Sequence, residues 1–273
     1  MSRPIQQIII IGGTIFFAAL SLGPLVYVLY VSLLSPALSP QAGSTLSLEH
    51  YRTVLTGPAL HFPRQLLNSV VVAFISAAGS VTLASLAAYA ITRLPLPGRM
   101  TILMAVLVAA MFPQIGIVGY LFRMMSTLGL INTYPALCLP YVSWTLPISL
   151  WILVGYFAKM PRDLDDAARL DGCSHWQAMW KIILPMARPG ILSVFLLAFI
   201  YAFNEFMFAL MLTSDYRART VSVAIAVFQG AHGQMPWGDI TAAAVVTTLP
   251  VVLLTILFQR HVVSGLTQGA IKG

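Results

Sequence analysis

Apolar residues dominate six long stretches of this chain, and segments with charged, proline or glycine residues separate them. A helix needs about 20 mostly apolar residues to cross a bilayer. Prolines inside such stretches, as at Pro113, are tolerated in membrane bundles because neighbouring groups satisfy the freed backbone. The pattern therefore predicts an all-α polytopic membrane protein with six transmembrane helices. Their expected ranges are 8–34, 66–92, 100–122, 136–158, 190–212 and 241–262.

Composition agrees with this pattern. Hydrophobic residues make up 59% of the chain and charged residues 8%, and the mean hydropathy is +0.87. A soluble domain carries about 25% charged residues, so lipid must cover much of this surface. No soluble domain can be cut out, and residues 1–273 are expected to form a single transmembrane domain. The net charge of +7 needs no nucleic-acid partner, because basic residues collect on the cytoplasmic side of membrane proteins.

The distribution of Lys and Arg predicts the orientation of the chain. If the N-terminus lies inside, the inner segments hold ten of the 15 basic residues and the outer loops hold five. The positive-inside rule then places both termini in the cytoplasm. The expected inner residues are Arg3, Arg93, Arg99, Lys159, Arg162, Arg169, Lys181, Arg188, Arg260 and Lys272.

One polar segment, residues 159–189, stands out between the fourth and fifth expected helices. Three aspartates, at 163, 165 and 166, would lie in the first turn of a short helix, where negative charge complements the helix dipole. Gly172 is placed to end that helix in the left-handed conformation. Ser174 can cap a second helix that runs to Leu184. Its apolar residues recur at helical spacing and predict one apolar stripe: Trp176, Met179, Trp180 and Ile183.

The spacing within this segment resembles the coupling-loop signature of ABC importer permeases. The matching positions are Asp166–Ala168, Gly172 and Ile182–Pro185. The chain departs from the family at Asp166, where the usual residue is Glu; the charge is kept and one methylene is lost. The small side chains of Ala167 and Ala168 are expected to offer a smooth surface for close packing by a partner.

The resemblance extends over essentially the whole chain and is tightest from about residue 160 to the end. The residues that carry it are Asn204–Phe206, Pro236–Asp239, Leu249–Pro250, Gln259–Arg260 and Gly265–Gly273. The chain thus resembles permease subunits of binding-protein-dependent ABC importers, in the carbohydrate family that includes the smaller permeases of maltose-type transporters.

This resemblance implies the type I importer fold and a set of partner chains. A second permease chain would complete a heterodimeric pore, two ATPase subunits would bind below it, and an extracytoplasmic sugar-binding protein would deliver a sugar or oligosaccharide such as maltose or trehalose. The expected location is the bacterial cytoplasmic (inner) membrane. The chain has no G-x-x-x-x-G-K-[ST] loop, so we expect it to be non-catalytic and without a cofactor of its own, with ATP and Mg held by the ATPase subunits.

The resemblance also assigns residues to two contacts with the ATPase. The coupling residues that it implies are Asp163, Asp166, Ala167, Ala168, Gly172, Leu184 and Pro185. A cytoplasmic C-terminal tail over residues 263–273 would make the second contact through Gly265, Thr267, Gly269, Lys272 and Gly273.

Asn204 and Glu205 are the candidates for a pore or gate, because an ionisable residue at membrane depth usually faces a cavity or a partner. If Asn204 and Glu205 lay near the outer end of their span, within reach of water, their polarity would not indicate a pore or gate. Several aromatic side chains suit stacking on sugar rings, but aromatic residues in membrane helices also serve as packing or interface anchors. These residues are Tyr89, Tyr120, Tyr141, Trp144, Tyr156 and Tyr201.

Other functions remain open at this point. A membrane-embedded enzyme would need a catalytic cluster, but the five histidines are scattered and no metal-ligand spacing is visible. A proton-coupled secondary carrier would not need the coupling signature. Within the importer class, glycerol phosphate or another polyol is an alternative to a sugar, and the sequence does not separate these substrates.

Overall fold

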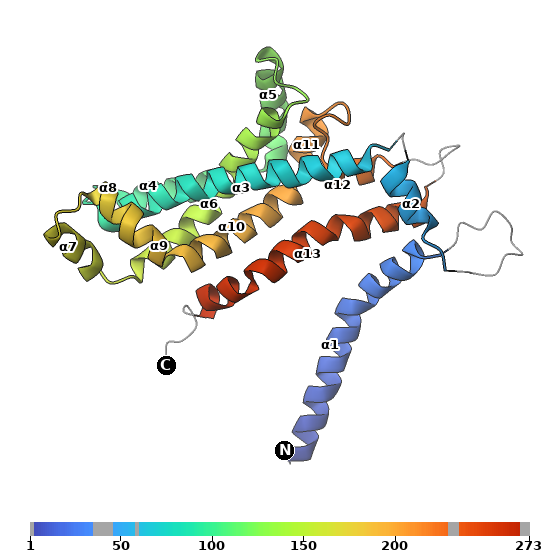
Figure 1. Ribbon diagram of the computed structural model, residues 1–273, viewed down its shortest axis with the longest axis horizontal. Helices are drawn as coiled ribbons and strands as arrows, with labels where there is room; N and C mark the ends of the chain where they lie inside the picture. Colours follow the sequence, from blue (N-terminus) through green and yellow to red (C-terminus); the bar gives the residue numbers. More distant parts are fainter. Residues whose placement is uncertain (1–2, 35–45, 58–59, 229–234, 268–273) are drawn as a thin grey trace, which may run out of the picture. The chain divides into compact units, whose positions relative to one another are not determined.

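The computed structural model describes residues 3–34, 46–57, 60–228 and 235–267 (Figure 1). These residues form helices and connecting loops, with a single antiparallel bridge between Leu34 and Leu46. Within the described ranges, four helices are long and apolar enough to cross a membrane, and the number rises to six if each of two sharply bent helix pairs counts as one span. The predicted all-α polytopic fold is confirmed.

The helices follow one another in this order: α1 Arg3–Ser32, α2 Glu49–Thr56, α3 Phe62–Arg93, α4 Arg99–Ala110, α5 Gln114–Thr127, α6 Tyr134–Ala158, α7 Asp163–Leu170, α8 His175–Ala178, the π-helix η1 Met179–Ile183, α9 Leu184–Met186, α10 Arg188–Phe203, α11 Met207–Leu212, α12 Val221–Ala226 and α13 Trp237–Thr267.

The chain divides into two compact units. The first comprises residues 1–63 and 224–249, and the second comprises residues 64–223 and 250–273. Helices α3, α12 and α13 each contribute residues to both units. The single transmembrane domain that the sequence predicts remains a prediction.

The first unit is held together by polar contacts near α2. The hydroxyls of Ser32 and Tyr51 share a hydrogen bond of 2.7 Å, and Nδ1 of His50 lies 2.6 Å from Oδ1 of Asp239 at the start of α13. The His50 ring also lies where a β-carbon on Gly238 would be, so this close approach requires glycine. By contrast, most apolar side chains of α1 between Ile10 and Tyr30 are exposed, which suits a helix that faces lipid.

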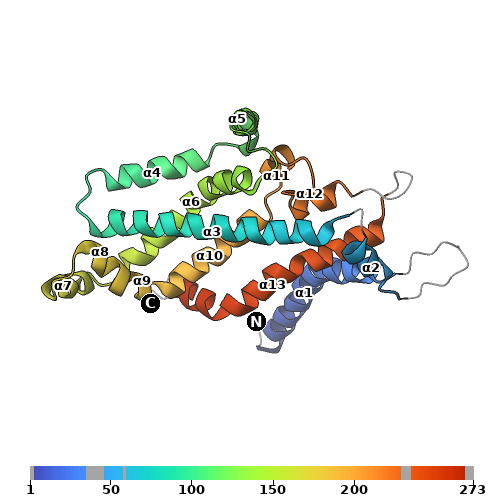
Figure 2. The ribbon, with the colours of Figure 1, turned by 45° about the horizontal axis from the view of Figure 1, so that its top comes forward.

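Small residues allow the helices of the second unit to pack closely. Figures 1 and 2 show α3, α6 and α10 side by side. On α3, Ser80 Oγ donates to Ser149 Oγ of α6 at 3.3 Å. Membrane helices gain stability from such contact because small side chains let their backbones approach. The buried small residues of α3 recur at helical spacing: Ser69, Ala73, Ser76, Ala77, Ser80, Ala84 and Ala88.

Two of the expected continuous spans are broken, and this corrects the sequence prediction. The stretch 100–122 forms α4 and α5, which are bent by 87° around Pro113. Proline has no backbone N–H and disfavours the helical conformation in the residue before it. The stretch 190–212 forms α10 and the short α11, which are separated by Asn204–Phe206.

Candidate functional site

Helix α7 begins and ends as the sequence predicts. Asp163 and two further aspartates occupy its first turn. At its end, Gly172 has a φ of +82°, so the predicted left-handed glycine is confirmed. The N–H of Cys173 donates to Ala168 O at 2.9 Å and the N–H of Gly172 donates to Arg169 O at 3.0 Å. These two bonds are the Schellman motif, which satisfies the last carbonyls of a helix.

The side chains of Arg93 and Asp165 tie α7 to the ends of two long helices. Nε of Arg93 lies 3.3 Å from Oδ2 of Asp165, and both side chains are largely buried. Nη2 of Arg93 also donates to the carbonyls of Phe157 and Met160, at 3.2 and 3.0 Å. A single guanidinium therefore joins α3, the end of α6 and α7.

A tyrosine strengthens this junction. The hydroxyl of Tyr89 on α3 lies within hydrogen-bond distance of Asp165 Oδ1 (3.4 Å) and of His175 O (3.1 Å), so α3 contacts both α7 and the start of α8. Sequence reasoning placed Asp165 in a first turn but missed its partners. The available signal was weak: Arg93 is a basic residue at the end of a predicted span, with no spacing that relates it to Asp165.

The outward face of α7 differs from the expected surface in one detail. Asp163, Asp166 and Ala167 are exposed, whereas Ala168 is only 1% exposed. Ala168 is buried because α7 packs against α8 and η1, so Ala167 is the alanine that the surface presents. Sequence reasoning also missed Leu170, which is 89% exposed. It lies off the buried face of α7, and its position in the sequence pattern of that helix could have marked it as an exposed leucine.

The second predicted helix of segment 159–189 is present but contains a π-helix. The capping box is confirmed: Ser174 Oγ accepts from the N–H of Gln177, and the Gln177 side chain accepts from the N–H of Ser174. The five residues of η1 follow, and their i→i+5 bonding changes the phase of the helix. Of the predicted apolar stripe, Met179 and Ile183 are therefore buried, while the two tryptophans are exposed, with their rings 5.7 Å apart.

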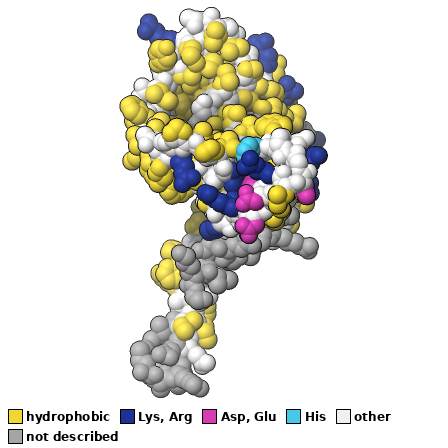
Figure 3. Space-filling view, turned by 90° about the vertical axis from the view of Figure 1, so that its left-hand side faces the viewer, with side chains coloured by type: hydrophobic (Ala, Val, Ile, Leu, Met, Phe, Trp, Pro, Cys, Tyr) yellow, Lys and Arg dark blue, Asp and Glu magenta, His cyan; other side chains and the backbone are white. Residues whose placement is uncertain are grey.

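Leu184 and Pro185 face the interior of the second unit. Both are half-buried and line a cavity of about 310 Å³ together with Ser85, Trp180 and Arg188. The same cavity is lined by residues of α3, among them Ser85. Figure 3 views the end of the second unit that holds α7, where acidic and basic side chains gather.

Most residues of the expected tail contact lie outside the described part of the chain. Gly265 and Thr267 lie in the last turns of α13. Gly269, Lys272 and Gly273 lie outside the described residues.

Glu205 caps a helix inside the apolar part of the chain. Its carboxylate accepts from the N–H groups of Phe208 (2.8 Å) and Ala209 (3.2 Å), and the residue is 9% exposed. A carboxylate at this position satisfies free N–H groups at the start of α11 and complements its dipole. The adjacent Asn204 is exposed, and its amide nitrogen donates to Ile200 O at 2.8 Å. Both residues line a cavity of about 510 Å³.

Over the described ranges, no group of three or more His, Cys, Asp or Glu side chains is close enough to hold a metal ion. Cys138 and Cys173 are free.

The fold is that of a polytopic membrane protein with an exposed polar segment, and comparison gives its family. Residues 69–268 match the binding-protein-dependent transport system inner membrane component. The chain belongs to this family of ABC importer permeases.

Several similar proteins are named for the transport of sugars. The chain is 49% identical to the trehalose/maltose transport system permease protein MalG of Thermococcus litoralis, over 98% of both chains. It is 40% identical to the trehalose transport system permease protein SugB of Mycobacterium tuberculosis, over 84% of each chain. A chain of a bacterial ABC transporter for the acidic polysaccharide alginate shares the fold, with a TM-score of 0.77 over 95% of this chain and 98% of the other, at 20% identity.

Proposed function

We propose that this chain is one permease of an ATP-driven importer that moves a sugar or oligosaccharide of the maltose or trehalose kind into the cytoplasm. The family and the sugar permeases among its relatives support the substrate class. The observation that carries the coupling role is the junction at Arg93. It joins an exposed, acid-rich helix, α7, to the ends of α3 and α6.

The proposed mechanism uses α7 as a lever. Its exposed residues, among them Asp166, Ala167 and Leu170, dock into a cleft of an ATPase subunit. When two ATPase subunits close around ATP and Mg, they move α7, and the Arg93–Asp165 pair passes the movement to α3 and α6. Rigid-body movement of this kind is a common way to switch access from one side of a membrane to the other.

The remaining parts of the assembly follow from the same proposal. A second permease chain completes the pore, and an extracytoplasmic binding protein delivers the sugar. Both termini lie in the cytoplasm, which agrees with the excess of basic residues in the segments assigned to that side. The C-terminal tail makes a second contact with the ATPase subunits.

The test is co-purification followed by transport. The tagged chain is isolated from native membranes in mild detergent, and the chains that accompany it are identified by mass. We expect a second permease and an ATPase. The complex is then reconstituted with the binding protein, and ATP hydrolysis and uptake are measured with trehalose, maltose and glycerol phosphate.

Two outcomes would contradict the proposal. If the chain is isolated without an ATPase in several detergents, and a proton gradient drives uptake, the chain is a secondary carrier. If glycerol phosphate is taken up in preference to the sugars, the substrate class is wrong while the importer mechanism stands.

A further inference from the structure

Two separate helix breaks meet at the cavity of about 510 Å³. Gln114, the first residue of α5, lines it directly after the break at Pro113. Asn204, Glu205 and Phe206, which form the break between α10 and α11, line it as well. Non-helical backbone at membrane depth is tolerated only where it is buried in protein or lines a water-filled cavity. Both breaks line this cavity, which we call the polar cavity because the amides of Gln114 and Asn204 lie in its lining.

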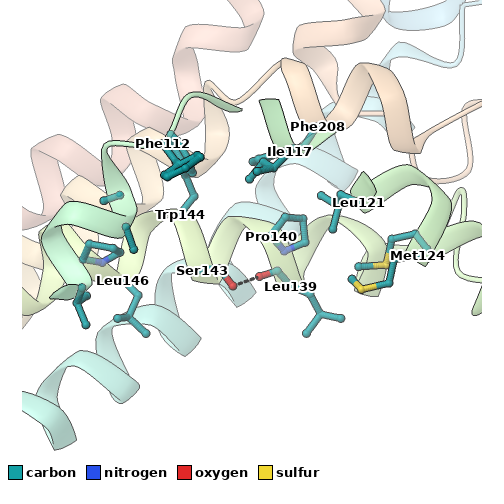
Figure 4. Close-up of a pocket in the computed structure, with 15 residues that line it drawn as sticks. Phe112, Ile117, Leu121, Met124, Leu139, Pro140, Ser143, Trp144, Leu146 and Phe208 are labelled. Atoms are coloured by element: carbon teal, nitrogen blue, oxygen red, sulfur yellow. Dashed lines mark hydrogen bonds between the residues drawn. The ribbon is translucent and has the colours of Figure 1, made fainter. Parts of the chain in front are cut away.

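A neighbouring cavity supplies the contrast. Its volume is about 690 Å³, and its lining is almost entirely apolar (Figure 4). The hydroxyl of Ser143 in that lining donates to Leu139 O of its own helix, at 3.0 Å. Trp144 lines both cavities and forms part of the wall of each. The second unit thus has one cavity with an apolar lining and, beside it, one whose lining includes amide side chains.

The groups in the polar cavity match the chemistry of a neutral sugar. The amides of Gln114 and Asn204 offer both donors and acceptors, as hydroxyl groups require. Trp144, Tyr201 and Phe206 offer aromatic faces for the apolar C–H face of a sugar ring, and Tyr201 is 54% exposed. None of the lining residues is a lysine or an arginine, so the cavity has no cation to pair with a phosphate.

We propose that this cavity is a sugar subsite on the transport path, formed by this chain. Asn204 and Gln114 hydrogen-bond the hydroxyls, and Trp144 stacks against the ring. Glu205 lines the site, and its carboxylate is held in place because it accepts hydrogen bonds at the start of α11. A volume of about 510 Å³ falls within the range of small-ligand pockets, about 300–1,000 Å³. This inference rests on the proposed function and deepens it to neutral saccharides that touch this chain directly.

The test is sugar uptake by the complete reconstituted importer with its binding protein. Asn204→Leu removes the amide and keeps the size of the side chain, while Trp144→Leu removes the aromatic face and Trp144→Phe keeps one. Trp151→Leu is the matched control, because Trp151 is an exposed tryptophan on the same helix, α6, that lines neither cavity. Trehalose, maltose and glycerol phosphate are the probes.

We expect Asn204→Leu to raise the KM for the preferred sugar about tenfold, the scale of one lost hydrogen bond, and to alter the preference between the two sugars. Trp144→Leu should do the same, Trp144→Phe should recover most of the loss, and Trp151→Leu should behave as wild type. Unchanged KM and unchanged preference in Asn204→Leu would overturn the subsite. A wild-type complex that hydrolyses ATP but carries neither sugar would instead remove the proposed function.

Discussion

A carboxylate inside an apolar bundle needs partners, and Glu205 has two backbone N–H groups. The sequence marked Glu205 as a pore or gate candidate because charge at membrane depth is costly. These contacts give the charge a structural role, because they satisfy free N–H groups in the first turn of α11, just after α10 ends. The adjacent Asn204 is the side chain of the pair that is exposed to the cavity.

Glu205→Ala should destabilise the chain by about 1–3 kcal/mol, because two N–H groups then lose their acceptor in a buried position. Glu205→Gln should cost less, since its amide oxygen still accepts. Thermal unfolding of the purified complex in detergent measures both. Asn204→Ala is the control, because its bond runs only to its own helix. Equal stability of Glu205→Ala and wild type would show that the cap is dispensable.

Asp215 makes the stability of the loop between α11 and α12 depend on pH. Hydrogen bonds from Arg217 and Asn132 hold the pKa of this carboxyl well below its usual range. A folded-state pKa that is lowered contributes stability above the ordinary Asp pKa of about 3.9, and this contribution is lost as the pH falls. The same Asn132 accepts from the N–H of Ser214, so the aspartate helps to hold this loop.

We therefore expect wild type to have a higher Tm than Asp215→Asn at pH 6, and the gap to narrow as the pH falls from about 5 towards 3. The group is solvent-accessible, so the gap should be small. Measurement of Tm for both proteins across this range checks the sign. A gap that widens at low pH would contradict it.

At the scale of the helix, the crossing of α10 over α6 depends on Gly190. A β-carbon there would lie 2.7 Å from Cδ2 of the Tyr156 ring, so the ring would have to move. Gly190→Ala should destabilise the chain by about 1–3 kcal/mol, as overpacking does. Gly155→Ala in α6 is the matched control, because nothing lies within 4 Å of its added β-carbon. Comparable Tm losses in the two variants would count against the close crossing.

The attachment of α7 to α3 and α6 is also decided at the scale of the helix. Removing Arg93 leaves Asp165 buried without its charge partner and frees the end of α6. Breaking a buried pair in this way costs about 3–5 kcal/mol. Arg93→Met should therefore speed hydrogen exchange in α7 and reduce sugar uptake. Arg123→Met, which changes an exposed arginine on α5, should do neither.

At the scale of the whole molecule, a substitution of Gly172 tests the proposed coupling to the ATPase. Its positive φ suits glycine and strains any other residue. Gly172→Asp should abolish uptake while the chain still inserts, because the turn that ends α7 no longer forms. Gly129→Asp imposes the same strain at a φ of +65° in the loop between α5 and α6. Uptake by Gly172→Asp at the level of Gly129→Asp would argue against a coupling role.

Much of the architecture is readable without coordinates, because it depends on local pattern. Apolar runs of sufficient length must cross the bilayer, a glycine after a short acidic helix ends it, and Ser174 caps the next helix. Such features depend on residues within one or two helical turns, so the chain order alone determines them. The coupling signature has the same local character.

Only the tertiary structure decided how distant residues meet. Arg93 lies 72 positions before Asp165, and no periodicity relates them; the packing of α3 beside α6 brings them to 3.3 Å. The breaks at Pro113 and Asn204 were hidden within apolar runs, because hydropathy measures burial and not helical continuity. Their meeting at one cavity with Trp144 follows from four helices, α5, α6, α10 and α11, folding together, which a linear pattern does not contain.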